Sequence, residues 1–183
     1  MKVLVSGFIA FAGFSENITE KIVNSLPVSL NNIDIYTVIL PVEYENAFKI
    51  LDNMIDQIKP DFVIATGMAA SRKFISIEKI AVNIDNSDTA DNAGVIKKDS
   101  LIVTNEDIAK TASLEYPDKV YEIEGVKNSY SAGTYVCNDL FYRLLSKSDS
   151  KDYPKISFIH FPSEDNMPYE KQLSIFLSIL SCL

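Results

Sequence analysis

The first half of the chain alternates between short apolar runs and amphipathic stretches. The apolar runs are bounded by glycine or proline, which predicts strands over residues 2–6, 33–40 and 61–67. Residues 43–58 repeat apolar positions at helical spacing and predict the clearest amphipathic helix. A helix is also expected over residues 17–26, because it opens with an asparagine that is followed three positions later by a glutamate.

The middle of the chain is less regular. Residues 74–84 alternate in the manner of a strand, and the polar residues 85–99 predict a long loop. Residues 107–127 show weak periodicity, so we expect at most one or two short helices there. Residues 126–130 are interpreted as a further strand that leads into a turn of small residues.

The last third of the chain returns to a clear pattern. Apolar residues recur at helical spacing after a small-residue turn, which predicts a helix that begins at Cys137 or Asn138. Residues 156–161 form an apolar run that ends before a proline and predict a strand. A closing helix is expected over residues 166–183, with Pro168 in its first turn.

Helices that alternate with apolar strands favour an α/β fold with a parallel sheet covered on both faces. The 183 residues suit one domain with a sizeable core, and the chain shows neither an internal repeat nor a linker. We therefore expect a single domain over residues 1–183.

Charge and composition exclude several classes of function. The formal net charge is −8, so neither nucleic acid nor an anionic membrane surface is expected as a partner. No run of 18 apolar residues occurs, and two distant cysteines do not make a disulfide framework, which favours a cytoplasmic protein. The single histidine excludes zinc sites built from two or three histidines of this chain.

Three side chains are candidates for nucleophilic catalysis. Cys137 stands at a predicted helix start, where the helix dipole is expected to lower the pKa of a thiol. His160 lies at the end of a predicted strand and is the sole imidazole available as a base. Glu78, within an isoleucine-rich run, is a candidate for orienting the imidazole, although a solvated strand residue is the commoner role. Residue types alone favour a buried core thiol over a nucleophile.

An aromatic loop follows the first predicted strand. It carries Phe8, Phe11 and Phe14 between glycines. The rings could fold back on the core or line an apolar ligand pocket at the end of the strand. The residues alone favour the core.

Three segments carry a family resemblance. They read I-S-I-E-K-I-A-V-N at residues 75–83, S-A-G-T-Y-V-C-N at residues 131–138, and F-I-H-F-P at residues 158–162. The chain resembles the pyroglutamyl peptidase I family, also called pyrrolidone-carboxylate peptidases, through these motifs and over most of its length. The resemblance implies a three-layer α/β/α sandwich with a mostly parallel twisted sheet, like that of phosphorylases and hydrolases.

The resemblance also implies an activity. Members of the family remove an N-terminal pyroglutamyl residue from small peptides, as cysteine exopeptidases without a metal or other cofactor. The matching motifs imply a triad of Cys137, His160 and Glu78. The resemblance places Phe8 and Phe11 in a flat apolar slot for the pyroglutamyl ring, with Tyr135 as another wall. It also suggests a homo-oligomer.

The chain departs from the family in two loops. Ile9, Ala10 and Ala12 replace a glutamate, a proline and a glycine of the aromatic loop, and Asp88 stands where the family usually carries an arginine. An acid that faced the site would destabilise a thiolate and an oxyanion. Two alternatives therefore stay open: a homologue that binds pyroglutamyl or other small amides without turnover, and a cysteine hydrolase of another small amide. The direction in which the side chain of Asp88 points bears on this choice.

Overall fold

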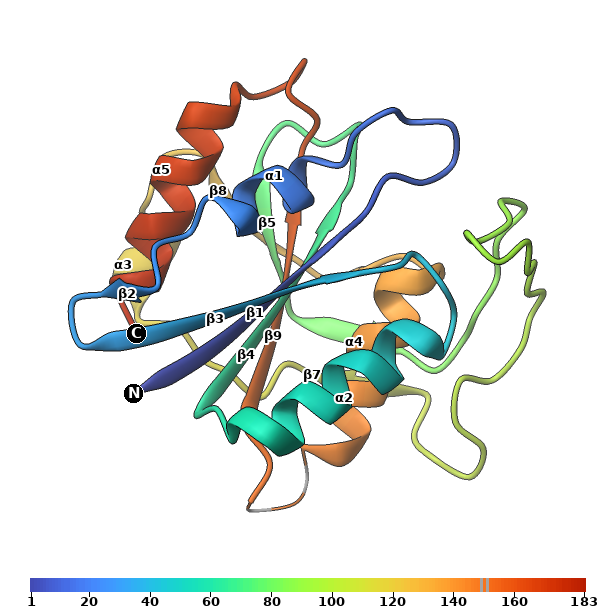
Figure 1. Ribbon diagram of the computed structural model, residues 1–183. Coiled ribbons are helices and arrows are strands. Elements are labelled where there is room, and N and C mark those ends of the chain that lie inside the picture. The colour runs from blue at the N-terminus through green and yellow to red at the C-terminus, as the bar shows by residue number, and fades with distance from the viewer. Residues whose placement is uncertain (149, 151) are drawn as a thin grey trace.

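A computed structural model describes residues 1–148, 150 and 152–183. Within these residues, seven strands form a central sheet in the order β2-β3-β1-β4-β9-β5-β8 (Figure 1). The strands are β1 (Lys2–Phe8), β2 (Ser29–Leu30), β3 (Ile33–Leu40), β4 (Phe62–Met68), β5 (Ile75–Glu78), β8 (Val126–Ser129) and β9 (Lys155–Phe161). A separate pair joins β6 (Ile80–Val82) to β7 (Ala109–Thr111).

The sheet is mostly parallel, as expected. The strands β3, β1, β4 and β9 run in one direction, whereas β5 is antiparallel to β9. The edge strand β8 is parallel to β5, and the short β2 is antiparallel to β3. The reversal at β5 lies beside the strand that carries His160, and it decides how the candidate site is assembled.

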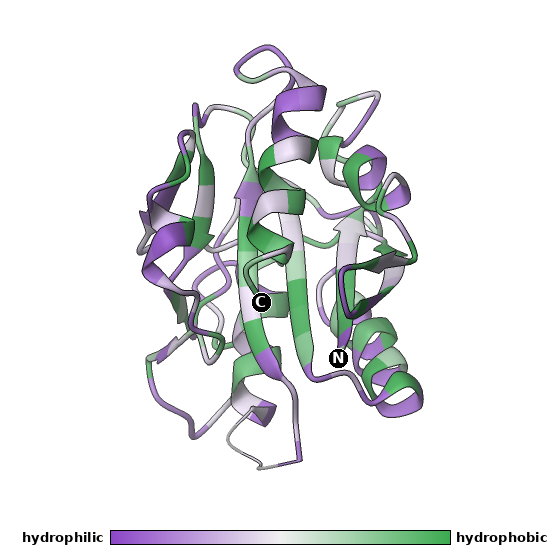
Figure 2. Ribbon diagram, turned by 90° about the vertical axis from the view of Figure 1, so that its left-hand side faces the viewer, coloured by the Kyte–Doolittle hydropathy of each residue, from purple (hydrophilic) through white to green (hydrophobic). Residues whose placement is uncertain are grey.

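Helices cover both faces of the sheet, which confirms the three-layer α/β/α architecture. The helices are α1 (Ile18–Asn24), α2 (Asn46–Ile58), α3 (Asp118–Tyr121), α4 (Val136–Lys147) and α5 (Tyr169–Leu180). The helices α1, α3 and α5 pack on one face, and α2 and α4 on the other (Figure 1). The strands between them are mostly apolar, and polar positions gather on the outer sides of the helices (Figure 2). No helix in the described part of the chain has the length and apolarity needed to cross a membrane.

Local chemistry explains the entry into the first helix. The side chain of Asn17 accepts a hydrogen bond from the backbone N–H of Thr19, which caps α1. A Cβ on Gly7 would lie 2.7 Å from the carbonyl oxygen of Thr19, so only glycine lets β1 approach this helix. The predicted helix start at Asn17 is confirmed by this cap. The close contact between Gly7 and Thr19 holds the end of β1 against α1, where the aromatic loop begins.

The strand predicted over residues 74–84 is wrong as one element. It breaks at Lys79, whose N–H donates to Ser129 O on one side while its carbonyl accepts from Ala112 N on the other. The chain therefore passes from the main sheet at β5 to the small sheet at β6. The apolar positions change phase at this point, from Ile75 and Ile77 to Ile80 and Val82, and all four residues of β5 are buried.

Other differences from the predicted elements are small. The helix α2 begins three residues later than predicted, after Glu45 adopts a φ of 60°. Pro168 caps α5 rather than entering its first turn, and that helix ends at Leu180. The predicted long loop is confirmed, since residues 85–99 contain no helix or strand and make one isolated bridge, between Asp85 and Ser100.

Candidate active site

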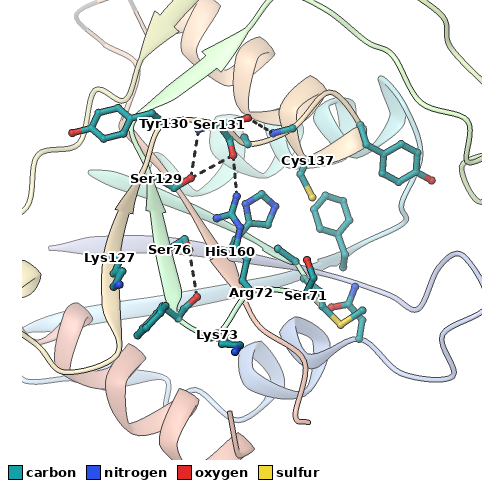
Figure 3. A pocket seen from close by; sticks show the side chains of 18 of the residues that line it. Ser71, Arg72, Lys73, Ser76, Lys127, Ser129, Tyr130, Ser131, Cys137 and His160 are labelled. Atoms are coloured by element: carbon teal, nitrogen blue, oxygen red, sulfur yellow. Dashed lines mark hydrogen bonds between the residues drawn. The ribbon is translucent and has the colours of Figure 1, made fainter. Parts of the chain in front are cut away.

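A cavity of about 990 Å³ opens at the carboxyl ends of β1, β4 and β9, beside the start of α4. This is the edge at which open α/β sheets bind ligands. Cys137, His160 and Arg72 lie in its wall, as Figure 3 shows. The rest of the lining mixes aromatic side chains with small polar ones, so the cavity can hold a ligand that is partly apolar.

Cys137 stands in the first turn of α4, after the cap residue Tyr135. The first backbone N–H groups of a helix have no partner within the helix, so this turn offers donors to a negatively charged oxygen. The sulfur fills the space above β4, because a Cβ on Gly67 would lie 2.7 Å from Cys137 Sγ and 3.1 Å from Phe158 Cζ. Glycine at this position therefore makes room for the thiol.

His160 and Glu78 meet through the antiparallel pairing of β9 and β5. His160 lies opposite Ser76, and Glu78 lies opposite Phe158, which makes the imidazole and the carboxylate diagonal neighbours on one face. His160 Nδ1 lies 2.7 Å from Glu78 Oε1, and the Glu78 side chain is fully buried. An ionised carboxylate only accepts, so Nδ1 carries the proton and Nε2 is left as the acceptor.

Arg72 completes this cluster from the loop after β4. Its Nη1 donates to Glu78 Oε1 at 2.6 Å, and its Nη2 donates to the carbonyl oxygen of Ser131 at 2.9 Å. The guanidinium therefore ties the buried carboxylate to the turn that precedes Cys137. Sequence analysis does not assign a role to Arg72, because its contacts with Glu78 and Ser131 are not visible in the spacing of the motifs.

The charge states follow from burial and from these contacts. Burial, followed by the charge of the Glu78 carboxylate, raises the pKa of Cys137 to about 12, and the charge of Arg72 opposes both. Any lowering of the thiol pKa by the helix start is therefore outweighed by burial and by Glu78. Burial also lowers the pKa of His160, against the opposing effect of Glu78. The resting site thus holds a thiol and a neutral imidazole.

Glu78 stays ionised within this cluster. Burial by itself raises the pKa of Glu78, but the hydrogen bond and charge of His160, followed by a hydrogen bond with Ser129 and the charge of Arg72, bring the pKa below its ordinary value. A carboxylate in this state accepts from both neighbours at once. It can therefore hold the imidazole in one tautomer and stabilise the imidazolium.

The aromatic residues expected in a slot are all found in the cavity wall. Phe8, Phe11 and Tyr135 line it, with ring centroids of Phe11 and Tyr135 6.1 Å apart. Phe8 is only 1% exposed, so its ring packs in the core and also forms part of the cavity wall. Tyr135 Oη donates to Ala90 O at 2.8 Å, which ties the long loop to the start of α4.

Asp88 points to solvent rather than to Cys137. Its side chain is 97% exposed and forms an ion pair with Lys98, which lowers the pKa of Asp88. Asp88 is also absent from the described lining of the cavity. No group of three or more potential ligand side chains is placed to hold a metal ion among the residues that the structure describes.

A thiol at a helix start is typical of a cysteine hydrolase when it shares a cavity on an α/β sheet with a histidine that is hydrogen-bonded to a buried carboxylate. Comparison with known proteins agrees. The model of the pyroglutamyl peptidase family matches residues 1–173. The chain belongs to this family, whose members are cysteine omega peptidases.

Relatives match over most of both chains. The pyrrolidone-carboxylate peptidase of Pyrococcus furiosus is 38% identical over 169 residues, which cover 88% of this chain and 81% of the relative. The pyrrolidone-carboxylate peptidase of Thermosipho melanesiensis is 37% identical over 177 residues, which cover 94% of this chain and 88% of the relative. The crystal structure of the pyrrolidone carboxyl peptidase from Fervidobacterium islandicum matches with a TM-score of 0.92 at 27% identity, covering 99% of this chain and 97% of that one. The crystal structure of a mutant pyrrolidone carboxyl peptidase from P. furiosus matches with a TM-score of 0.91 at 32% identity, covering 98% of this chain and 96% of that one.

Proposed function

We propose that this protein hydrolyses the bond after an N-terminal pyroglutamyl residue, with Cys137 as nucleophile, His160 as general base and acid, and Glu78 as the orienting carboxylate. The observation that carries the proposal is His160, which lines one cavity with Cys137 and whose Nδ1 lies 2.7 Å from Oε1 of the buried Glu78. Membership of the pyroglutamyl peptidase family supports the reaction class.

The reaction follows from the charge states of the resting site. Cys137 Sγ attacks the carbonyl carbon of the scissile amide while His160 Nε2 takes the thiol proton. Because the pKa of the thiol is raised to about 12, the proton leaves during the attack rather than before it. The backbone N–H groups in the first turn of α4 stabilise the oxyanion. The imidazolium then protonates the leaving amine, which leaves a thioester on the sulfur.

The second half of the reaction reverses these roles. Neutral His160 removes a proton from water, whose oxygen attacks the thioester carbonyl. The carbon–sulfur bond breaks, pyroglutamate is released, and the thiol regains its proton. Glu78 stabilises the imidazolium in both halves, and Arg72 holds Glu78 in place.

The cavity lining favours a neutral substrate end. An ordinary aminopeptidase binds the α-ammonium of its substrate with a carboxylate. None of the described residues that line this cavity is an aspartate or a glutamate. A lactam has no ammonium, and its flat ring suits the wall formed by Phe8, Phe11 and Tyr135.

The decisive experiment is release of a fluorescent amine from a pyroglutamyl amide. We expect turnover by the wild type and by Cys182→Ala, and none by Cys137→Ala. The Cys182 variant is a matched control, because it removes the other thiol of the chain. Equal rates for wild type and Cys137→Ala would contradict the proposal.

A binding protein without turnover is the second candidate. The observation that favours it is the raised pKa of Cys137, which leaves little thiolate in the resting protein. Calorimetry with pyroglutamyl peptides distinguishes the two, because this candidate requires binding by the wild type without release of the amine. A single domain over residues 1–183, a homo-oligomer and a cytoplasmic location stay predictions.

A further inference from the structure

The cavity continues beyond the candidate catalytic residues. Its volume of about 990 Å³ is at the upper end of the roughly 300–1,000 Å³ of pockets that hold drug-sized ligands, which is more than one five-membered ring requires. The lining extends past His160 to Lys73 and Lys127. In Figure 3 these two lysines lie on the far side of His160 from Cys137.

The register of the sheet places Lys127 in a row with His160. Ser76 on β5 lies opposite His160 on β9 and opposite Lys127 on β8. Residues directly opposite one another share a face of the sheet, so all three side chains stand on the face that carries the cavity. Two interstrand steps of about 4.8 Å separate the backbones of His160 and Lys127, which is roughly 10 Å in total.

This part of the cavity is cationic. Arg72, Lys73 and Lys127 line it, and no acidic side chain does among the described residues, although the chain as a whole has a formal net charge of −8. Arg72 is neutralised by Glu78 at 2.6 Å. Neither lysine forms an ion pair with a carboxylate in the part of the chain that the structure describes. Lys127 Nζ instead lies 3.9 Å from the ring centroid of Phe74.

We propose that Lys73 and Lys127 form an outer subsite for a carboxylate on the residue that follows pyroglutamate, so that the enzyme favours peptides with an acidic group there. The inference rests on the proposed function and specifies its substrate class. One extended residue spans about 3.5 Å, and an acidic side chain or a free C-terminus extends further, which brings the carboxylate within reach of the long lysine side chains. The carboxylate of the residue is recognised whether it belongs to the side chain or to the terminus.

The test compares three peptides: pyroglutamyl-glutamate amide, pyroglutamyl-glutamine amide, and pyroglutamyl-glutamine with a free C-terminus. The first differs from the second only in a side-chain carboxylate, and the third only in a terminal one. At low ionic strength we expect kcat/KM to be higher for at least one acidic peptide than for the neutral amide. An exposed ion pair is worth roughly two- to five-fold in kcat/KM per lysine, so we expect about a four- to twenty-five-fold preference from the two lysines together. The preference shrinks in high salt because the charges are exposed.

The double variant Lys73→Gln, Lys127→Gln is expected to bring this ratio to about one without slowing hydrolysis of the neutral amide. Lys155→Gln is the matched control: it removes the same charge from the opposite end of β9, outside the cavity lining, and is expected to keep the preference. An equal kcat/KM for all three peptides in the wild type, or an unchanged preference in the double variant, overturns the inference.

Binding separates this inference from the proposed function. Calorimetry with Cys137→Ala measures the affinity for the same peptides without turnover. A preference in binding, with no hydrolysis by the wild type, overturns the peptidase and supports the subsite. Hydrolysis of all three peptides at one salt-independent rate supports the peptidase and overturns the subsite.

Discussion

Two buried carboxylates, seven positions apart in the chain, respond to burial in opposite ways. The side chains of Glu78 and Asp85 are both fully buried, and each has a cation beside it, Arg72 at 2.6 Å and Lys97 at 3.1 Å. Yet the pKa of Glu78 lies below its ordinary value, whereas burial and the nearby Asp139 raise the pKa of Asp85 to about 7.

The difference lies in the remaining neighbours. Glu78 meets a second donor, His160, whereas Asp85 meets a second acid, Asp139, which opposes its ionisation. Burial raises the cost of any charge, so the sign of the second neighbour decides which form is stable. Glu78 therefore keeps a fixed negative charge beside His160. The cluster of Asp85 anchors the long loop and can change its protonation near neutral pH.

The largest effect is expected for Glu78→Gln. Glutamine can neither hold the imidazole in the same tautomer nor balance its charge, and loss of the equivalent carboxylate in a triad costs about 10⁴ in kcat. We expect a loss of about 10³–10⁴, measured as release of a fluorescent amine from a pyroglutamyl amide. Asp85→Asn is the matched control and is expected to retain kcat within about three-fold, because Asp85 contacts Lys97 and Asp139 rather than His160. Similar losses for both variants would show that the two clusters are not functionally distinct.

A smaller loss is expected for Arg72→Gln. The guanidinium donates both to Glu78 and to Ser131 O, and hydrogen bonds to charged groups contribute about 1.5–3 kcal/mol, which corresponds to roughly 10- to 150-fold in kcat. Because Arg72 acts through Glu78, the pH profile of kcat should also shift. Arg72→Lys keeps the charge without the two-pronged geometry and should recover only part of the rate. A variant with normal kcat and an unchanged pH profile contradicts this positioning role.

In Glu78→Gln, the rate at which Cys137 is alkylated should rise while kcat falls. The Glu78 carboxylate raises the pKa of this thiol, so Glu78→Gln should increase the thiolate fraction even though it abolishes turnover. We expect iodoacetamide to modify Cys137 about three- to ten-fold faster in this variant, since one pKa unit is a factor of ten. Mass spectrometry can follow Cys137 with Cys182 as the internal reference. Slower alkylation would mean that Glu78 stabilises the thiolate instead.

The smallest effect concerns stability. A carboxyl group whose pKa is raised in the folded state binds more protons than in the unfolded chain, so the wild type loses stability as the pH rises from about 4 to about 7. Asp85→Asn removes this slope. We expect the free energy of unfolding of the variant to match the wild type near pH 4 and to exceed it at pH 8 by on the order of 1 kcal/mol. Urea unfolding at several pH values measures both curves, and parallel curves would contradict the assignment.

The helices and most strands follow from the sequence because their hydrophobic periods are strong. The break at Lys79 coincides with a change of phase in the alternation, from Ile75 and Ile77 to Ile80 and Val82, which one continuous strand does not accommodate. The long-range partners Ser129 and Ala112, however, could not be predicted from that pattern. The same limit applies within the site. Cys137 and His160 stand out by residue type and position, but the raised pKa of the thiol depends on burial and on Glu78, which no spacing contains.

Clusters assembled from several loops were the least visible in the sequence. Arg72 lies six positions before Glu78, and a cation ahead of a buried acid could have drawn attention to it. The contact of Asp85 with Lys97 and Asp139 joins a loop to a helix more than 50 positions later, so neither composition nor period indicates it. Asp88 shows the opposite limit: its position in the sequence suggested that it lies near the site, but its side chain is exposed and pairs with Lys98.

The position of β9 has a consequence for the order in which the protein matures. This strand comes last in the chain, yet it lies inside the sheet between β4 and β5. During synthesis the ribosome releases β4 and β5 long before their shared neighbour, and N-terminal segments begin to fold first. The partners His160 and Glu78 are 82 positions apart, so a nascent chain that has not yet inserted β9 holds Cys137 and Glu78 without the imidazole. The cluster that we propose as the active site can therefore form only after β9 has been made and inserted.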